Sequence, residues 1–291
     1  MRGLAVNGRG IAVMCFTMFI FAAQDGLSRY LAEEYNVFMI VMIRYWFFLA
    51  FVVSISRIRN GSVTAVAQTR QPLFQLMRGM LLAVEILVTV ISFTLLGLVE
   101  AHAIFAIYPL IVTVLSGPIL GERVGWRRWL AVGVGAIGML IILQPGVSVF
   151  SPYALVPVLG AFLFALYNLS NRYAARQDSS ATSFFWTGLG GFVLMTAIGP
   201  FFWQPMAGAD WVVMAVLCVT GATGHFLLIK AYEFAEASAV QPFAFFQLVF
   251  AAAIGVTIWG EDLPLTTIIG AGVIVAAGVF TALRERAAAR V

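Results

Sequence analysis

Apolar stretches of about 20 residues, each long enough to cross a membrane as a helix, follow one another along almost the whole chain. A helix needs roughly 20 such residues to span the ~30 Å hydrocarbon core of a bilayer, and lipid offers no partner to the backbone of an open strand or loop. We therefore expect an all-α membrane protein with ten transmembrane helices. The predicted spans are residues 10–31, 36–56, 72–97, 101–120, 126–144, 152–172, 181–203, 209–231, 239–259 and 264–283.

Charged side chains are too few for a water-soluble surface. They make up 10% of the 291 residues, and 62% of the residues are hydrophobic, whereas soluble domains are about 25% charged. The only lysine, Lys230, lacks the glycine-rich lead-in of a nucleotide-binding P-loop. Cys15 and Cys218 lie far apart, inside apolar stretches. We expect no cofactor, no metal, no nucleic-acid partner and no ATPase subunit, and we expect membrane lipid as a partner.

The arginines predict the orientation of the chain. Of the 17 basic residues, all but two fall on the side that holds both termini and the even-numbered loops. Arg29 alone falls on the opposite side, and Arg44 lies inside a predicted span. Because basic residues are enriched in cytoplasmic loops, we expect a multi-pass protein of the bacterial inner membrane with both termini in the cytoplasm.

The two halves of the chain repeat one another. Three motifs recur in register, namely F-x-F-A at 19–22 and 162–165, E-A-x-A at 100–103 and 236–239, and G-E at 121–122 and 260–261. We therefore divide the chain into residues 1–145 and 146–291, with five predicted spans each. An odd number of spans makes the second copy enter the membrane upside down. Inverted repeats of this kind are typical of secondary transporters with a site near the middle of the bilayer.

These motifs, together with glycine-rich fifth and tenth spans, resemble the drug/metabolite transporter superfamily, specifically its EamA-type exporters, over nearly the whole chain. Within that family the chain is similar to the bacterial aromatic amino-acid exporters, and also to members assigned to other metabolites. The resemblance implies a secondary transporter that exports amino acids, aromatic and other neutral ones, or related small metabolites by alternating access. The alternative within transport is an exporter or importer of another metabolite or of a drug-like amphiphile.

Two alternatives come from other classes. A membrane-embedded enzyme is disfavoured because the sequence has no His or carboxylate cluster at metal-ligand spacing and no assembled nucleophile and base. We assign no catalytic residue. An interaction protein without a substrate does not need an inverted repeat.

Polar side chains inside the predicted spans are the site candidates, because each costs roughly 2.5–3.5 kcal/mol at the centre of an inserted helix. They are Asp25, Arg44, Glu85, His102, Asn168, His225 and Gln247. We assign Glu85, His225 and Gln247 to substrate binding. Glu85 lies about 20 Å along its span, where we expect it to face a wet cavity rather than make a structural hydrogen bond. Arg78 is expected to snorkel to the cytoplasmic surface, and His102 to be a solvated helix end rather than a proton relay.

Aromatic residues are abundant, and three are placed to contact a substrate. In the aromatic amino-acid exporters, the stretches that correspond to Tyr108, Phe164 and Tyr167 line the central cavity. The resemblance therefore implies that these rings stack on a flat substrate. Packing in the protein core is the alternative for each of them.

Arg44 is a permanent cation surrounded by apolar and aromatic residues. It lies about 12 Å from the external start of its span, and Asp25 lies about 22 Å from the cytoplasmic start of the preceding span, so the two reach a similar depth. We predict an intramembrane ion pair between Asp25 and Arg44. The alternatives for Arg44 are binding of a substrate carboxylate, which suits a guanidinium, and snorkelling to the outer surface.

Overall fold

The computed structural model describes residues 2–60, 62–122, 125–143, 152–266, 268–273, 276–277 and 280. Within these ranges the chain is helical and contains no β-strand. The elements are α1 (Arg2–Glu34), α2 (Val37–Asn60), α3 (Thr64–Ala67), α4 (Pro72–Phe105), α5 (Tyr108–Leu120), α6 (Trp126–Leu143), η1 (Pro152–Ala154), α7 (Leu155–Ala174), α8 (Ser180–Ile198), η2 (Gly199–Phe202), α9 (Gly208–Phe234), α10 (Ala237–Ala244) and α11 (Phe246–Trp259). The all-α prediction is confirmed for the described part of the chain.

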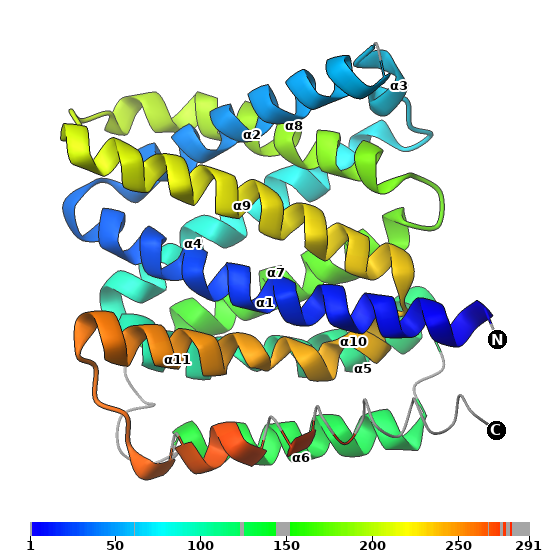
Figure 1. Ribbon diagram of the computed structural model, residues 1–291, viewed down its shortest axis with the longest axis vertical. Helices are drawn as coiled ribbons and strands as arrows, with labels where there is room; N and C mark the ends of the chain where they lie inside the picture. The colour runs from blue at the N-terminus through cyan, green and yellow to red at the C-terminus, as the bar shows by residue number, and fades with distance from the viewer. Residues whose placement is uncertain are drawn as a thin grey trace.

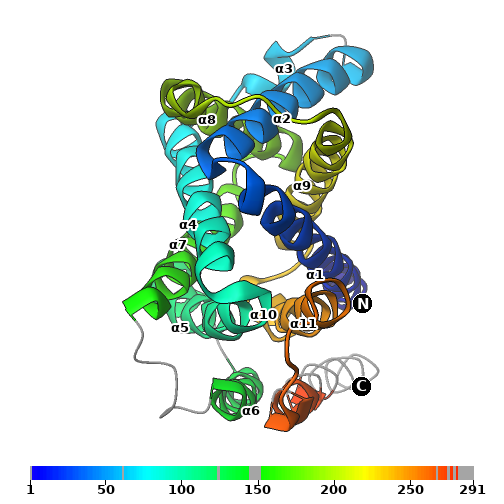
Figure 2. The ribbon, with the colours of Figure 1, turned by 90° about the vertical axis from the view of Figure 1, so that its left-hand side faces the viewer.

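The long helices form one bundle in which sequence-distant segments lie side by side (Figure 1). Helix α1 packs along α9 and α11, whereas α4 packs between α7 and α8. Helix α6 lies at the edge of the bundle, beside α5 and α10 (Figure 2). Elements of the first half therefore contact elements of the second half throughout, so the walls of any central site come from both.

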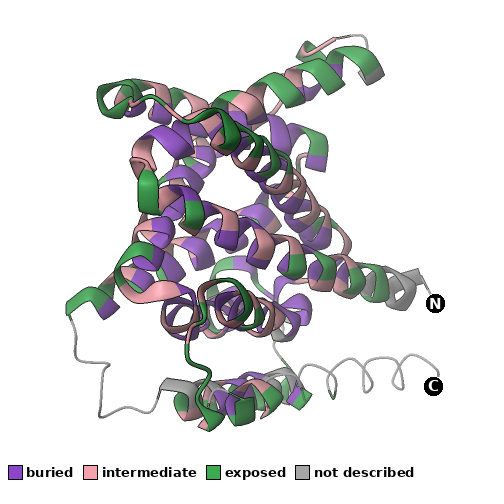
Figure 3. Cartoon of the chain, turned by 60° about the vertical axis from the view of Figure 1, so that its left-hand side comes forward, coloured by how far each residue is buried: buried purple, intermediate pink, exposed green. Residues whose placement is uncertain are grey.

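The outward faces of the helices carry large apolar side chains, as expected of a surface in contact with lipid. Phe201 is 85% exposed and Ile58 is 82% exposed. Residues that face the middle of the bundle are buried (Figure 3). Seven helical segments of the described residues are long and apolar enough to cross a membrane. The prediction of a multi-pass membrane protein is confirmed.

One of these seven segments, Pro72–Leu120, has 49 residues, more than twice the length that one crossing needs. Gly97 interrupts it with φ 78° and ψ 176°, at the position where the sequence predicts the end of a span. The count of ten crossings and the inversion of the repeats stay predictions. The predicted boundary between residues 145 and 146 lies outside the described residues, as does part of the predicted span 264–283.

A glutamate joins the two halves at one end of the bundle. Gly260 ends α11 in the left-handed conformation (φ 64°), which places Glu261 beside the break in α4. The Glu261 carboxylate forms an ion pair with Arg29 of α1. It also accepts hydrogen bonds from the backbone N–H groups of Leu98 (3.0 Å) and Val99 (2.8 Å). These are the N–H groups that a new helical segment leaves unpaired, so the glutamate caps that segment.

A second glutamate makes the corresponding contacts at the opposite end. Gly121 ends α5 with φ 68°, and Glu122 follows it. The Glu122 carboxylate accepts from Nε of Arg172 on α7 (2.9 Å) and from the backbone N–H of Ala237 at the start of α10 (3.3 Å). Arg172 also donates to the carbonyl of Tyr232 (3.1 Å). The repeated G-E motif therefore caps a helix of the other half in both copies.

We predict that the Glu122–Arg172 pair stabilises the bundle. Glu122→Ala leaves the partly buried Arg172 without this carboxylate. We therefore expect the free energy of unfolding, measured by thermal unfolding in detergent, to fall by about 3 kcal/mol. The double variant with Arg172→Ala should lose less than the sum of the single losses. Lys230→Ala breaks the exposed Lys230–Glu233 pair and, as the matched control, should cost under about 1 kcal/mol. Strictly additive losses would contradict a coupled pair.

Candidate functional site

A small cavity of about 30 Å³ lies in the middle of the bundle, between α1, α2, α4, α7, α9 and α11. Its lining residues are Phe21, Gln24, Asp25, Arg44, Glu85, Ile86, Thr89, Val90, Phe105, Phe164, His225 and Gln247. One water molecule needs roughly 10–15 Å³ of such a cavity, so there is room for about two waters. The cavity is therefore too small for an organic substrate, which fits only after the lining side chains or helices move apart.

Two carboxylates lie on the walls of this cavity. Gln247 Nε2 donates to Asp25 Oδ2 (2.9 Å), and His102 Nε2 lies 3.0 Å from the same oxygen. Glu85 Oε1 accepts from the hydroxyl of Thr89, one turn along α4 (2.7 Å). Asp25 and Glu85 are 6% and 3% exposed, so the protein keeps two acidic groups in an environment that strongly disfavours unpaired charge.

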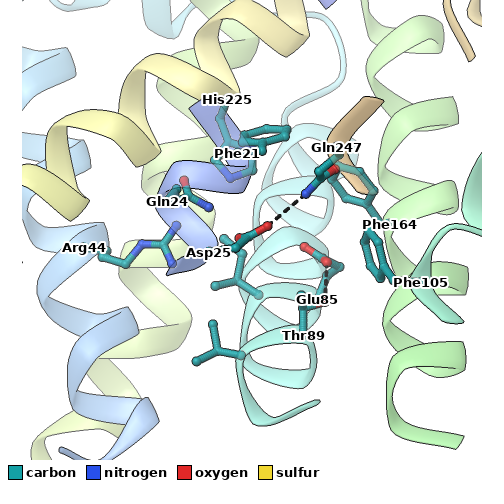
Figure 4. A pocket seen from close by; sticks show the side chains of 12 residues that line it. Phe21, Gln24, Asp25, Arg44, Glu85, Thr89, Phe105, Phe164, His225 and Gln247 are labelled. Carbon is teal, nitrogen blue, oxygen red and sulfur yellow. Dashed lines mark hydrogen bonds between the residues drawn. The ribbon is translucent and has the colours of Figure 1, made fainter. Parts of the chain in front are cut away.

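Arg44 lines the same cavity from α2, on the side opposite Phe105 and Phe164, with Asp25 between them (Figure 4). Its guanidinium is buried, and its one hydrogen bond in the described part of the chain is a long one, from Nη1 to Ser28 Oγ (3.5 Å). A Cβ at Gly221 on α9 would come within 3.2 Å of Nη2. The glycine therefore leaves room for the guanidinium beside the cavity.

The structure corrects the predicted partner of Asp25. Among the described residues no direct Asp25–Arg44 ion pair is formed, because the Asp25 carboxylate is bonded to His102 of α4 and Gln247 of α11. Snorkelling of Arg44 is also wrong, since the side chain is buried in the bundle. Asp25 and Arg44 do line the same cavity, in agreement with the similar depth expected for them.

Aromatic rings form one wall of the cavity. Phe164 packs edge-on against Phe21 (centroids 6.2 Å apart) and against Tyr108 (4.8 Å). Of the three predicted aromatic residues, Phe164 lines the cavity, while Tyr108 and Tyr167 lie behind it and are buried. Phe21 was not predicted, although it occupies the same place in the F-x-F-A repeat as Phe164. That repeat was the signal that could have found it.

Several polar atoms at the cavity have no hydrogen-bond partner within the described ranges. They are Oε1 of Gln24, Oε1 of Gln247 and both ring nitrogens of His225. Buried polar atoms are normally paired, so a group of unpaired ones around one cavity indicates a place for water or a polar ligand. The predicted residues Glu85, His225 and Gln247 therefore meet at this cavity, together with Gln24 and Thr89, which sequence reasoning missed.

His102 was expected to be a solvated helix end, and this expectation is wrong. It is 2% exposed, and its ring stacks on Phe93 with centroids 4.9 Å apart and planes 7° apart. The physical reason is the break at Gly97. The helical segment that starts after Gly97 carries His102 into the bundle, where it reaches Asp25.

Arg78 does not snorkel either. It is 2% exposed and donates to Oε1 of Gln75 (2.9 Å), to Oδ1 of Asn171 and to the carbonyl of Ser183 (2.5 Å). These acceptors lie on α4, α7 and α8, so Arg78 ties three helices together. Its guanidinium also lies 5.6 Å from the ring of Tyr167.

No group of three or more His, Cys, Asp or Glu side chains with metal-site geometry occurs in the part of the chain that the structure describes. The cavity instead combines a guanidinium, two carboxylates, neutral amides and aromatic rings. Such a set binds and orients a small polar molecule with an apolar part.

Comparisons with known proteins find curated transporters of several different small molecules. A curated S-adenosylmethionine uptake transporter of Rickettsia felis is 26% identical over 279 residues, which cover 96% of this chain and 94% of that relative. A riboflavin transporter of Vibrio cholerae is 27% identical and covers 89% of this chain and 88% of its own length. The pseudopaline exporter CntI of Pseudomonas aeruginosa is 26% identical over 73% of this chain and 76% of its own.

A solved crystal structure with 15% sequence identity has the same fold, with a TM-score of 0.75 over 95% of this chain and 98% of the other. The model of the EamA-like transporter family matches the chain twice, at residues 8–144 and 151–283. Together these segments cover nearly the whole chain, one in each half. The chain therefore belongs to the EamA-like transporter family and is a multi-pass membrane transporter of small molecules, not an enzyme.

Proposed function

We propose that this transporter carries amino acids, or compounds built on an amino acid, through the central cavity by alternating access. Aromatic and other neutral amino acids are the members of this class that the sequence predicts. The observation that carries the proposal is the nearly unpaired guanidinium of Arg44 in the same cavity as two carboxylates. An amino acid has a carboxylate that can bind the guanidinium and an ammonium that can bind one of the two carboxylates.

Each part of such a substrate has a matching surface. A forked guanidinium binds a carboxylate through two hydrogen bonds. Asp25 or Glu85 accepts from the ammonium, and the unpaired Oε1 atoms of Gln24 and Gln247 are further acceptors. Phe164, Phe105 and Phe21 offer ring faces and edges to a flat side chain. All of these residues line one cavity, so a single molecule can engage them together once the cavity widens.

The S-adenosylmethionine uptake transporters among the relatives support this class of substrate. S-adenosylmethionine joins an amino-acid end to a flat purine, which matches both the charged and the aromatic parts of the cavity. Riboflavin has a flat ring system without an ammonium and carboxylate pair, so it is the second candidate, favoured by the aromatic wall alone. The relatives include both uptake transporters and an exporter. We keep export as the proposed direction.

We propose the bacterial inner membrane as the location, with both termini in the cytoplasm. The asymmetry of basic residues supports this orientation. In the structure the two ends of the bundle are distinct, because Arg172 and Glu122 lie beside the end of α9 and Arg29 and Glu261 lie at the other end. The first of these ends is the proposed cytoplasmic one.

Arg44 is expected to recognise the carboxylate. In proteoliposome counterflow, Arg44→Gln should raise the apparent KM for tyrosine roughly tenfold to a hundredfold, as expected for the loss of a charge-assisted hydrogen bond of about 1.5–3 kcal/mol. Transport of tyramine, which lacks the carboxylate, should change little. Lys230→Gln is the control, because Lys230 lies on α9 and does not line the cavity. Equal losses for both compounds, or transport of riboflavin alone from a panel that includes S-adenosylmethionine, would contradict the proposal.

Phe164 is expected to discriminate by ring size. Phe164→Ala removes the aromatic wall at the cavity, so transport of phenylalanine and tyrosine should fall by roughly tenfold more than transport of alanine or threonine. Tyr108→Phe removes only the hydroxyl of a ring behind the wall and is the matched control. The measurement is initial uptake by each variant at equal protein abundance. A uniform loss for all substrates would assign Phe164 to packing alone.

Orientation is testable with single cysteines in a background without Cys15 and Cys218. Ala209→Cys lies at the start of α9 and should react with an impermeant thiol reagent added outside intact cells. Gln177→Cys lies after α7 and should react only after the membrane is opened. Both side chains are exposed, so access to water does not separate them. The reverse labelling pattern would invert the proposed topology.

A further inference from the structure

We infer that Asp25 and His102 together hold one exchangeable proton in the middle of the bundle, and that the substrate is carried in exchange for this proton. The position of the proton follows from geometry alone. The exchange with substrate rests on the proposed function.

The tautomer of His102 is set by the contact that its Nδ1 atom makes. Its Nδ1 lies 2.9 Å from the backbone carbonyl oxygen of Leu98, one turn earlier in the same helical segment. A carbonyl oxygen only accepts hydrogen bonds. Nδ1 must therefore carry a hydrogen, because otherwise two lone pairs would face one another at this distance. In a neutral imidazole this leaves Nε2 with its lone pair exposed.

The other ring nitrogen of His102, Nε2, faces Asp25. Nε2 of His102 lies 3.0 Å from Oδ2 of Asp25, and an ionised carboxylate is also only an acceptor. A lone pair on Nε2 and an ionised Asp25 would repel one another in a buried site. One proton must therefore lie between them, either as an imidazolium beside a carboxylate or as an imidazole beside a carboxylic acid. In both forms the pair has no net charge.

The surroundings keep this proton away from bulk water and open it to the cavity. The side chains of His102 and Asp25 are 2% and 8% exposed, and the imidazole is covered on one face by Phe93. Asp25 lines the cavity. Gln247 donates to the same Oδ2 atom (2.9 Å) and so supports negative charge on that oxygen. A charged group that enters the cavity therefore acts directly on Oδ2 of Asp25, the oxygen that shares the proton.

Other ionisable groups line the cavity or lie behind its wall. They are Arg44 on α2, Glu85 on α4, Tyr108 on α5, Tyr167 on α7 and His225 on α9. Of these, Glu85 is the rival proton carrier, since it is a buried carboxyl group at the cavity. Its Oε1 accepts from Thr89, and this contact fixes no proton on Glu85. The His102–Asp25 contact is the one that requires a proton.

Exchange follows from charge balance. When a substrate ammonium binds at Asp25, it supplies the positive charge that the shared proton supplied before. The proton then leaves to water on the side to which the cavity is open, and His102 stays neutral with its hydrogen on Nδ1. When the substrate leaves on the other side, a proton from that side restores the pair. One zwitterion moved against one proton transfers one positive charge across the membrane in each cycle.

The position of the proton is testable without any substrate. The chain has two histidines, so His225→Asn leaves one imidazole signal in nitrogen NMR of histidine-labelled protein in lipid. We expect either an imidazolium, or a neutral ring protonated at Nδ1 together with an infrared carboxylic-acid band that Asp25→Asn removes. A neutral ring protonated at Nε2 beside an ionised Asp25 would overturn the inference.

Exchange is tested in proteoliposomes with labelled tyrosine. A pH gradient across the wild-type membrane should drive accumulation and an electrical current, and exchange of tyrosine for tyrosine should proceed without a gradient. His102→Gln should lower gradient-driven accumulation at least tenfold more than it lowers tyrosine exchange. Glu85→Gln is the comparison variant and should not show that split.

Each result decides between the claims. Wild-type exchange without gradient-driven accumulation would overturn proton exchange and leave the proposed function standing. The split appearing in Glu85→Gln instead of His102→Gln would move the proton to Glu85 and also overturn the inference. If no compound of the panel exchanges at all, the proposed function fails, and the NMR measurement still decides where the proton lies.

Discussion

Two glutamates, each one residue after a left-handed glycine, hold the halves of this bundle together. Glu122 and Glu261 each pair with an arginine of the other half and each accept from backbone N–H groups at the start of a helical segment. A helix that starts inside a membrane protein needs such acceptors, because lipid supplies none. The G-E motif repeats in the sequence because each half solves the same problem for the other.

Much of the architecture could be predicted because the bilayer limits what a sequence can do. The length of the apolar stretches gave the helices, and the rarity of polar side chains in lipid pointed to the site. Glu85, His225 and Gln247 do meet at one cavity, as do Asp25 and Arg44. The family was recognisable from the repeated motifs. The high energetic cost of unpaired backbone groups and of polar side chains in lipid restricts the sequence to patterns that can be recognised.

Partner choice could not be predicted in the same way. Counting residues along a helix gives the depth of a side chain but not the direction in which it points around the axis. Asp25 and Arg44 do share a depth, yet Asp25 is bonded to His102 and Gln247. The break at Gly97 moved His102 inward, and the acceptors of Arg78 come from three helices. Tyr108 and Tyr167 lie one layer behind the wall for the same reason.

The caps and the cavity are linked through one residue. The backbone N–H of Leu98 donates to Glu261, and its carbonyl oxygen accepts from the ring of His102. If the helical segment after Gly97 moves away from Glu261, the carbonyl that fixes the tautomer of His102 moves with it. The structure has both glutamate caps formed and a central cavity of about 30 Å³. Because His102 lies on the same segment, a movement of that segment away from Glu261 also disturbs the contact between His102 and Asp25.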